Sequence, residues 1–216
     1  MKKFNLSLVL FVVAVFALLS FSPVIAYADT DTAALYYSGP GGQSSGNDYV
    51  FPYNFNIDGS ATLTPLMCLS FTLDITPGES WTATIAQVMG NTNYEKAAYI
   101  FSQASAPGAS TDQIAVAQWS NWVLFDAGAS SSVPTNYQGD VSALLDTAAA
   151  YVTANPDSSL YSKYVVYLPV VGSQSENGLP QNMMGNAPTP EPGSLILLGT
   201  GIFGLATFMY RRKRIA

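Results

Sequence analysis

The sequence predicts an α+β domain that lies between two targeting segments. Segments in which apolar and polar residues alternate flank a central block with helical periodicity, and both ends of the chain combine an apolar run with basic residues. The alternation predicts an antiparallel, sandwich-like sheet, and the central block predicts two to three helices. We therefore divide the 216 residues into a signal peptide at 1–28, an extracytoplasmic domain at 29–171, a flexible stalk at 172–189 and a C-terminal targeting segment at 190–216.

The first 28 residues have the three parts of a secretory signal peptide. Lys2 and Lys3 give it a positive start, the run Leu6–Phe21 is apolar, and Ala26 and Ala28 form a small-x-small cleavage site. A retained N-terminal anchor is the alternative, but the apolar run is short for a membrane span. We expect cleavage after Ala28.

Four segments have the pattern of strands. The clearest is 69–75, where Leu, Phe, Leu and Ile alternate with polar residues, and 81–88 alternates in the same way. Turn residues between these two segments predict an antiparallel hairpin. The other two predicted strands are 49–57, in which Pro52 requires an edge or a bulge, and 164–171.

Helical periodicity replaces the alternation in the middle of the domain. Ser110 or Thr111 is the expected cap of one helix, and Asp140 is the expected cap of another. The predicted helices span 94–104, 111–126 and 141–154. The segment 172–189, by contrast, is polar and contains several prolines and glycines, which predicts the flexible stalk.

Charge and composition exclude several classes of function. Only 10% of the residues are charged, there is no His, and there is one Cys. Between residues 29 and 190, two lysines face thirteen carboxylates, a net charge of −11, so we expect no binding to nucleic acid. Without His there is no Ser-His-Asp or Cys-His pair and no His-ligated zinc, so we expect no metal, no cofactor and no enzymatic activity. A glycosidase that uses two carboxylates stays open as the enzymatic alternative.

The C-terminal segment has three parts in a fixed order. Pro190, Glu191 and Pro192 come first, and the uncharged run 194–210 follows, which is just long enough for a membrane helix. The chain then closes with a basic cluster made of Arg211, Arg212, Lys213 and Arg214. Because basic residues stay on the cytoplasmic side, the domain upstream is expected outside the inner membrane.

This tripartite end resembles the PEP-CTERM sorting signal of exopolysaccharide-producing Gram-negative bacteria. In proteins with that signal, exosortase, a membrane protease-transpeptidase, recognises the Pro-Glu-Pro, removes the tail and releases the body. The resemblance implies that exosortase is a partner and that the precursor is held in the inner membrane with its body in the periplasm. It also implies a final place on the outer surface or in the exopolysaccharide matrix of a biofilm. An ordinary single-span anchor is the alternative.

The lone Cys68 requires an explanation, because an unpaired thiol in an exported protein is open to oxidation. Gln118 lies on the apolar face of the predicted helix 111–126, where a buried amide needs a partner. At these residues the body resembles the thioester domains of bacterial surface adhesins, in which a Cys and a Gln form an internal thioester that traps amines on a target. The resemblance implies a Cys68–Gln118 bond, with Gln113 as the competing amide. A buried free Cys with a Gln bonded to the backbone is the alternative.

Three functions are therefore compatible with the sequence. The first is a covalent adhesin whose partners are surface amines. The second is a non-catalytic structural protein of the exopolysaccharide matrix with a buried free Cys. The third is the carboxylate-based glycosidase, for which no paired-carboxylate motif is present.

Overall fold

The structure is a computed structural model that describes residues 32–173 and 180–188. The predicted signal peptide and the predicted sorting segment at 190–216 lie outside the described residues. Within the described residues, no helix is both long enough and apolar enough to cross a membrane.

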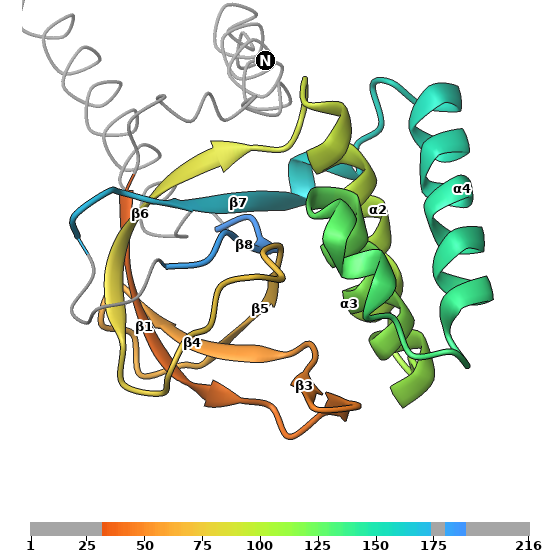
Figure 1. The fold of residues 1–216 in the computed structure, drawn as a ribbon. Helices are drawn as coiled ribbons and strands as arrows, with labels where there is room; N and C mark the ends of the chain where they lie inside the picture. The colour runs from red at the N-terminus through yellow and green to blue at the C-terminus, as the bar shows by residue number, and fades with distance from the viewer. Residues whose placement is uncertain (1–31, 174–179, 189–216) are drawn as a thin grey trace, which may run out of the picture. The chain divides into compact units, whose positions relative to one another are not determined.

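The α+β class is confirmed, but the sheet is a closed barrel and not an open, sandwich-like sheet (Figure 1). Within the described residues, six antiparallel strands follow one another around the barrel in the order β1, β4, β5, β8, β7, β6. The strands are β1 Thr32–Pro40, β4 Tyr53–Ile57, β5 Thr64–Cys68, β6 Ser80–Gln87, β7 Tyr164–Pro169 and β8 Met183–Asn186. Pairing of β1 with β6 closes the circle, so none of the six strands is left with a free edge along its whole length. A separate ribbon pairs β2 (Ser44–Ser45) with β3 (Asp48–Tyr49).

The first strand, β1, is one that the sequence prediction did not include. Its side chains alternate strictly, with Ala33, Leu35 and Tyr37 buried and the residues between them exposed. β1 pairs with β4 on one side and with β6 on the other. It therefore joins the two halves of the barrel wall.

The predicted strand 69–75 and its hairpin with 81–88 are wrong. Residues 69–75 form a loop, whereas β6 pairs with β1 and β7. The alternation in this loop has another cause: the Phe71 ring lies 5.5 Å from the ring of Trp119 and 5.4 Å from that of Trp122. Phe71 thus packs on α3 without any strand pairing.

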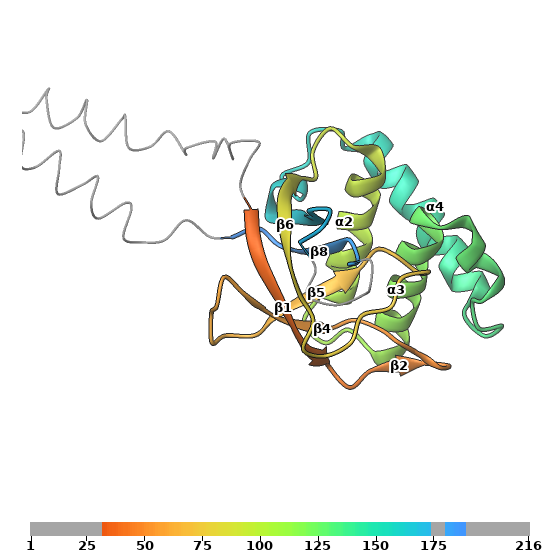
Figure 2. The ribbon, with the colours of Figure 1, turned by 60° about the vertical axis from the view of Figure 1, so that its left-hand side comes forward.

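The three predicted helices are present as α2 (Thr92–Ala104), α3 (Thr111–Phe125) and α4 (Gln138–Ala154). They lie together on one side of the barrel (Figures 1 and 2). Two short 3₁₀ turns, η1 (Ala127–Ser131) and η2 (Tyr161–Lys163), follow α3 and α4.

A side-chain cap explains where α3 begins, whereas α4 begins without one. Ser110 caps α3 as predicted, and Gln113 completes a reciprocal capping box by accepting from the Ser110 backbone N–H. The prediction that Asp140 caps α4 is wrong, since Tyr137 is the N-cap residue and makes no side-chain cap. Asp140 instead lies in the first turn, where its negative charge still stabilises the helix dipole.

The structure also contradicts a flexible stalk over 172–189, because residues 183–186 form β8 inside the barrel wall. β8 pairs with β5 on one side and with β7 on the other. Its Met183 and Met184 are completely buried, and Gln181 just before it is also buried. A segment that reads as polar linker therefore supplies the strand that closes the gap between β5 and β7.

The neighbouring strands β5, β8 and β7 are covered on both faces. Cys68 and Met183 face the barrel interior, whereas Met67 and Met184 belong to the second core, between the barrel and the helices. The register pairs Met67 with Met184 and Cys68 with Met183. Strands that are buried on both sides are apolar at successive positions, which removes the alternation that reveals a strand in the sequence.

Candidate functional site

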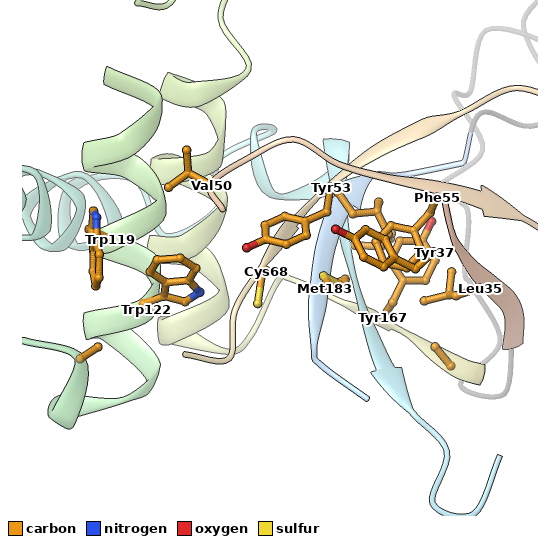
Figure 3. Packing of buried hydrophobic residues seen from close by; sticks show 14 of the residues in the cluster. Leu35, Tyr37, Val50, Tyr53, Phe55, Cys68, Trp119, Trp122, Tyr167 and Met183 are labelled. Atoms are coloured by element: carbon orange, nitrogen blue, oxygen red, sulfur yellow. The ribbon is translucent and has the colours of Figure 1, made fainter. Parts of the chain in front are cut away.

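The candidate site is built around Cys68, which is the last residue of β5. Its side chain points between the barrel interior and α3, close to Tyr53 and Trp122 (Figure 3). Only 1% of the residue is exposed. Nothing about this cysteine resembles a surface thiol.

The closest partner of the thiol is the side chain of Gln181. The Cys68 Sγ donates to the Gln181 Oε1 over 2.7 Å, and both residues are buried. That length is usual for an O–H···O bond and is short for the larger sulfur atom. The thiol is therefore in tight contact with the amide group.

Strand pairing explains why these two residues meet across 113 positions of sequence. Cys68 is in register with Met183, and the pairing continues beyond β5 through a bond from the Leu69 N–H to the Asn182 carbonyl of 2.9 Å. The Asn182 N–H in turn donates to the Ser70 hydroxyl. The backbone before β8 is thus fixed opposite the end of β5, which holds Gln181 at the thiol.

Gln118, the amide expected from sequence, also reaches Cys68, but at its backbone. Its Nε2 donates to the Cys68 carbonyl oxygen over 2.7 Å, and its Oε1 is buried without a hydrogen-bond partner among the described residues. Gln113 is engaged at the start of α3 by its bonds with Ser110. Of the three glutamines, Gln181 is the one whose amide contacts the sulfur.

The face of α3 that meets β5 carries further buried polar groups. Asn121 is completely buried and donates to the Met67 thioether, while its Oδ1 has no partner among the described residues. Trp122 is almost completely buried, and its indole nitrogen points toward Cys68 (Figure 3). Gln118, Asn121 and Trp122 lie one helical turn or less apart and hold the end of β5 against the helix.

The electrostatics of the site favour a neutral thiol. Burial raises the pKa of Cys68 to about 12, and the charge of Asp74 acts in the same direction. The Trp122 indole and the Ser70 backbone N–H oppose this rise, because both donate toward the sulfur and favour the thiolate. The Ser70 N–H lies 3.4 Å from Sγ. The Trp122 N–H makes no full hydrogen bond within the described residues, so its effect comes from a longer contact.

This environment predicts slow alkylation of a free Cys68 thiol. In a Gln181→Ala variant, in which the thiol has no amide beside it, we expect iodoacetamide at pH 8 to alkylate the folded protein about a thousandfold more slowly than the unfolded protein, because the thiolate fraction falls by that factor. Mass spectrometry of quenched time points measures both rates, and Cys68→Ala gives the unlabelled baseline. Equal rates in the folded and unfolded protein would contradict the buried, neutral thiol.

Residues 32–173 and 180–188 contain no group of three His, Cys, Asp or Glu side chains that could hold a metal ion. What remains at the centre is a thiol against an amide in a nearly water-free place. A thiol and a carboxamide can react to form a thioester, with ammonia as the leaving group.

Comparison with known proteins identifies the other functional segment. Residues 188–213 match the model of the PEP-CTERM protein-sorting motif. The C-terminal segment is a PEP-CTERM signal. The predicted sorting signal is thereby confirmed, and it covers Pro190, Glu191 and Pro192 as well as most of the basic cluster. No curated protein and no solved structure matches the chain.

The PEP-CTERM signal has three consequences for the protein. It implies a precursor anchored in the membrane, export to the cell surface, and exosortase as the processing partner. These statements concern the address of the protein. They do not specify the chemistry of the barrel.

Sequence reasoning found Cys68 and the helix beside it but missed Gln181. One signal was present: Gln181 and Asn182 directly precede Met183 and Met184, a pair of large apolar residues inside an otherwise polar segment. Such a pair needs burial, and burial there brings the preceding amide into the fold. The length of the segment and its prolines concealed this.

Proposed function

We propose that this exported, exosortase-sorted protein is a covalent adhesin that carries an internal thioester between Cys68 and Gln181. The observation that supports it most is the 2.7 Å separation between the Cys68 sulfur and the Gln181 amide oxygen in a buried site. Two atoms attached to the same carbon lie about as close as this. The proposal thus retains the thioester that the sequence resemblance implies and transfers its acyl group from Gln118 to Gln181.

The bond forms without any cofactor. The Cys68 sulfur attacks the amide carbon of Gln181, the C–N bond breaks, and ammonia leaves with the proton of the thiol. Strand pairing supplies the proximity that this otherwise slow exchange requires, since β5 and β8 hold both groups in contact. Burial of both residues keeps water from hydrolysing the product.

Capture of a target replaces the sulfur on the acyl carbon with an amine, which reverses the step in which ammonia was lost. A primary amine attacks the acyl carbon of Gln181, the C–S bond breaks, and the sulfur takes the proton that the amine gives up. The products are an amide that joins Gln181 to the target and a free Cys68 thiol. On this proposal the protein is not an enzyme, because its single thioester is consumed by the reaction.

The charge of the domain suits amine-bearing targets. Ten carboxylates and two lysines lie within the described residues, so the surface is strongly acidic. Such a field attracts surfaces rich in protonated amines and raises their local concentration. After sorting, we place the protein on the outer surface or in the extracellular matrix, where such targets are met.

A mass measurement tests the thioester. The protein recovered after export, compared with the mass calculated from its own sequenced ends, should be lighter by one ammonia, and methylamine should restore a free thiol and leave Gln181 methylated. Cys68→Ala and Gln181→Ala should each remove the deficit. Gln113→Ala and a folded Gln118→Ala should both keep it, since neither amide contacts the sulfur.

The alternative is a non-catalytic matrix protein with a buried free Cys. The raised pKa of Cys68 favours it, because a neutral, buried thiol is unreactive. Wild-type protein at full sequence mass, with a thiol that alkylates only after unfolding, would establish this alternative and exclude the adhesin.

A further inference from the structure

We propose that the indole N–H of Trp122 stabilises the negative charge that develops on the Cys68 sulfur when the thioester opens. This inference rests on the proposed thioester. It gives Trp122 a direct part in the reaction, beyond its place in the core. The indole nitrogen of Trp119, the other tryptophan of α3, points away from Cys68 (Figure 3).

The indole N–H of Trp122 is an unpaired donor. The Trp122 Nε1 is buried and has no hydrogen-bond acceptor within the described residues. A buried N–H without an acceptor destabilises the fold and requires an explanation. Trp119, three residues earlier on α3, shows the ordinary solution, since its indole donates to the Ser45 hydroxyl over 3.0 Å.

The direction of the Trp122 indole N–H also supports this role. The indole nitrogen of Trp122 points toward Cys68 (Figure 3), and the effect of its N–H on the sulfur favours the thiolate over the thiol. The backbone N–H of Ser70 donates to the same sulfur over 3.4 Å. Two N–H groups are therefore directed at the sulfur, as a group that becomes an anion during a reaction requires.

The remaining groups near the sulfur cannot take this role. The Tyr53 hydroxyl also points toward Cys68, but its hydrogen is donated to the Tyr49 carbonyl over 2.5 Å. Asp74 carries negative charge and opposes the thiolate. Gln118 donates to the backbone of Cys68 and not to its sulfur.

The chemistry places the charge on sulfur in both directions. When an amine attacks the acyl carbon, the electron pair of the C–S bond passes to sulfur before the proton of the amine reaches it. When the thioester forms, the sulfur bears partial negative charge as it attacks the Gln181 amide. A donor directed at the sulfur lowers the barrier of both steps without changing the products.

The test compares two substitutions of the same kind on one helix. Trp122→Phe removes the donor and retains an aromatic ring, and Trp119→Phe removes the hydrogen-bonded indole next to it as a matched control. We expect methylamine to open the thioester of Trp122→Phe about tenfold to a hundredfold more slowly than that of wild type, the usual effect of one hydrogen bond to a charged group. The thioester of Trp119→Phe should open at the wild-type rate.

The possible results separate this inference from the thioester itself. Wild-type protein without an ammonia deficit contradicts both. A wild-type deficit together with unchanged opening in Trp122→Phe contradicts the role of Trp122 alone. A folded Trp122→Phe protein that forms no thioester, while Trp119→Phe forms it, supports the role, because formation develops the same charge on sulfur.

A measurement on the wild-type protein covers the case in which Trp122→Phe does not fold. The indole N–H resonances of Trp81, Trp119 and Trp122 are followed by NMR before and after methylamine. We expect the Trp122 resonance to shift most, because the atom in front of its N–H changes from an acyl sulfur to a thiol. A Trp122 resonance that moves no more than that of Trp119 would overturn the inference.

Discussion

A chain that ends at residue 179, before β8, is expected not to fold cooperatively. Loss of β8 removes Met183 and Met184, both completely buried, and each contributes about 1.5–3 kcal/mol by burial. It also leaves β5 and β7 with unpaired backbone groups at the gap. The sum is a large part of the 5–15 kcal/mol that stabilises an ordinary domain.

The matched control is a chain that ends at residue 188 and keeps β8. Thermal unfolding followed by circular dichroism should give one sharp transition for the longer chain and none for the shorter chain. If both chains unfold cooperatively at the same temperature, β8 is not an integral part of the barrel.

Replacing Glu191 with Gln is expected to block processing almost completely. The prolines on either side of Glu191 favour an extended backbone that cannot join a helix. Glu191 is the one charged residue of this tripeptide, so it is the group that exosortase can recognise by charge. Wild-type protein should lose its basic cluster and end near residues 190 to 192, whereas Glu191→Gln should stay in the membrane fraction with Arg211 to Arg214 attached.

Glu176→Gln is the matched control, since it removes the same charge upstream of the sorting motif. Sequencing of the C-terminal peptide and fractionation of cells give both results. Glu191→Gln protein that is trimmed and released like the Glu176→Gln control would show that the carboxylate is not read, and wild-type surface protein that retains the basic cluster would contradict processing altogether.

The helices of this protein could be predicted because their signals are local. Capping at Ser110 and apolar periodicity located α3 within a residue of its end, and the same kind of pattern located α2. The barrel could not be predicted in this way. Its closure depends on which strands pair, and no local pattern states that β5 pairs with β8 or that β6 pairs with β1.

The two largest differences have opposite physical causes. Residues 69–75 alternate like a strand although they form a loop, from which the Phe71 side chain packs on Trp119 and Trp122. Residues 183–186 do not alternate, because β8 is buried on both faces and Gly185 leaves the space that the Leu66 side chain fills. Alternation of apolar and polar residues indicates burial on one face only. It therefore misses a strand that is buried on both faces, and a loop that packs on a helix can show the same pattern.

The site was predicted in part for the same reason. Cys68 and Gln118 were found from local pattern, and the structure does bring Gln118 to the Cys68 carbonyl. The contact between Cys68 and Gln181 joins residues 113 positions apart through the pairing of β5 with β8. A contact that depends on strand pairing becomes visible only when the pairing is known.

On the proposed function, the position of Gln181 has a mechanical consequence. A target joined to this side chain is separated from the PEP-CTERM segment, which begins at residue 188, by a stretch of chain that consists of little more than β8. While the chain is held by its C-terminal end, tension between target and cell passes along this short stretch and bypasses the other five strands and the helices. Pulling can detach β8 from its neighbours, but it cannot break the connection by unfolding the domain. On that proposal the barrel forms the bond, and the few residues after Gln181 bear the force.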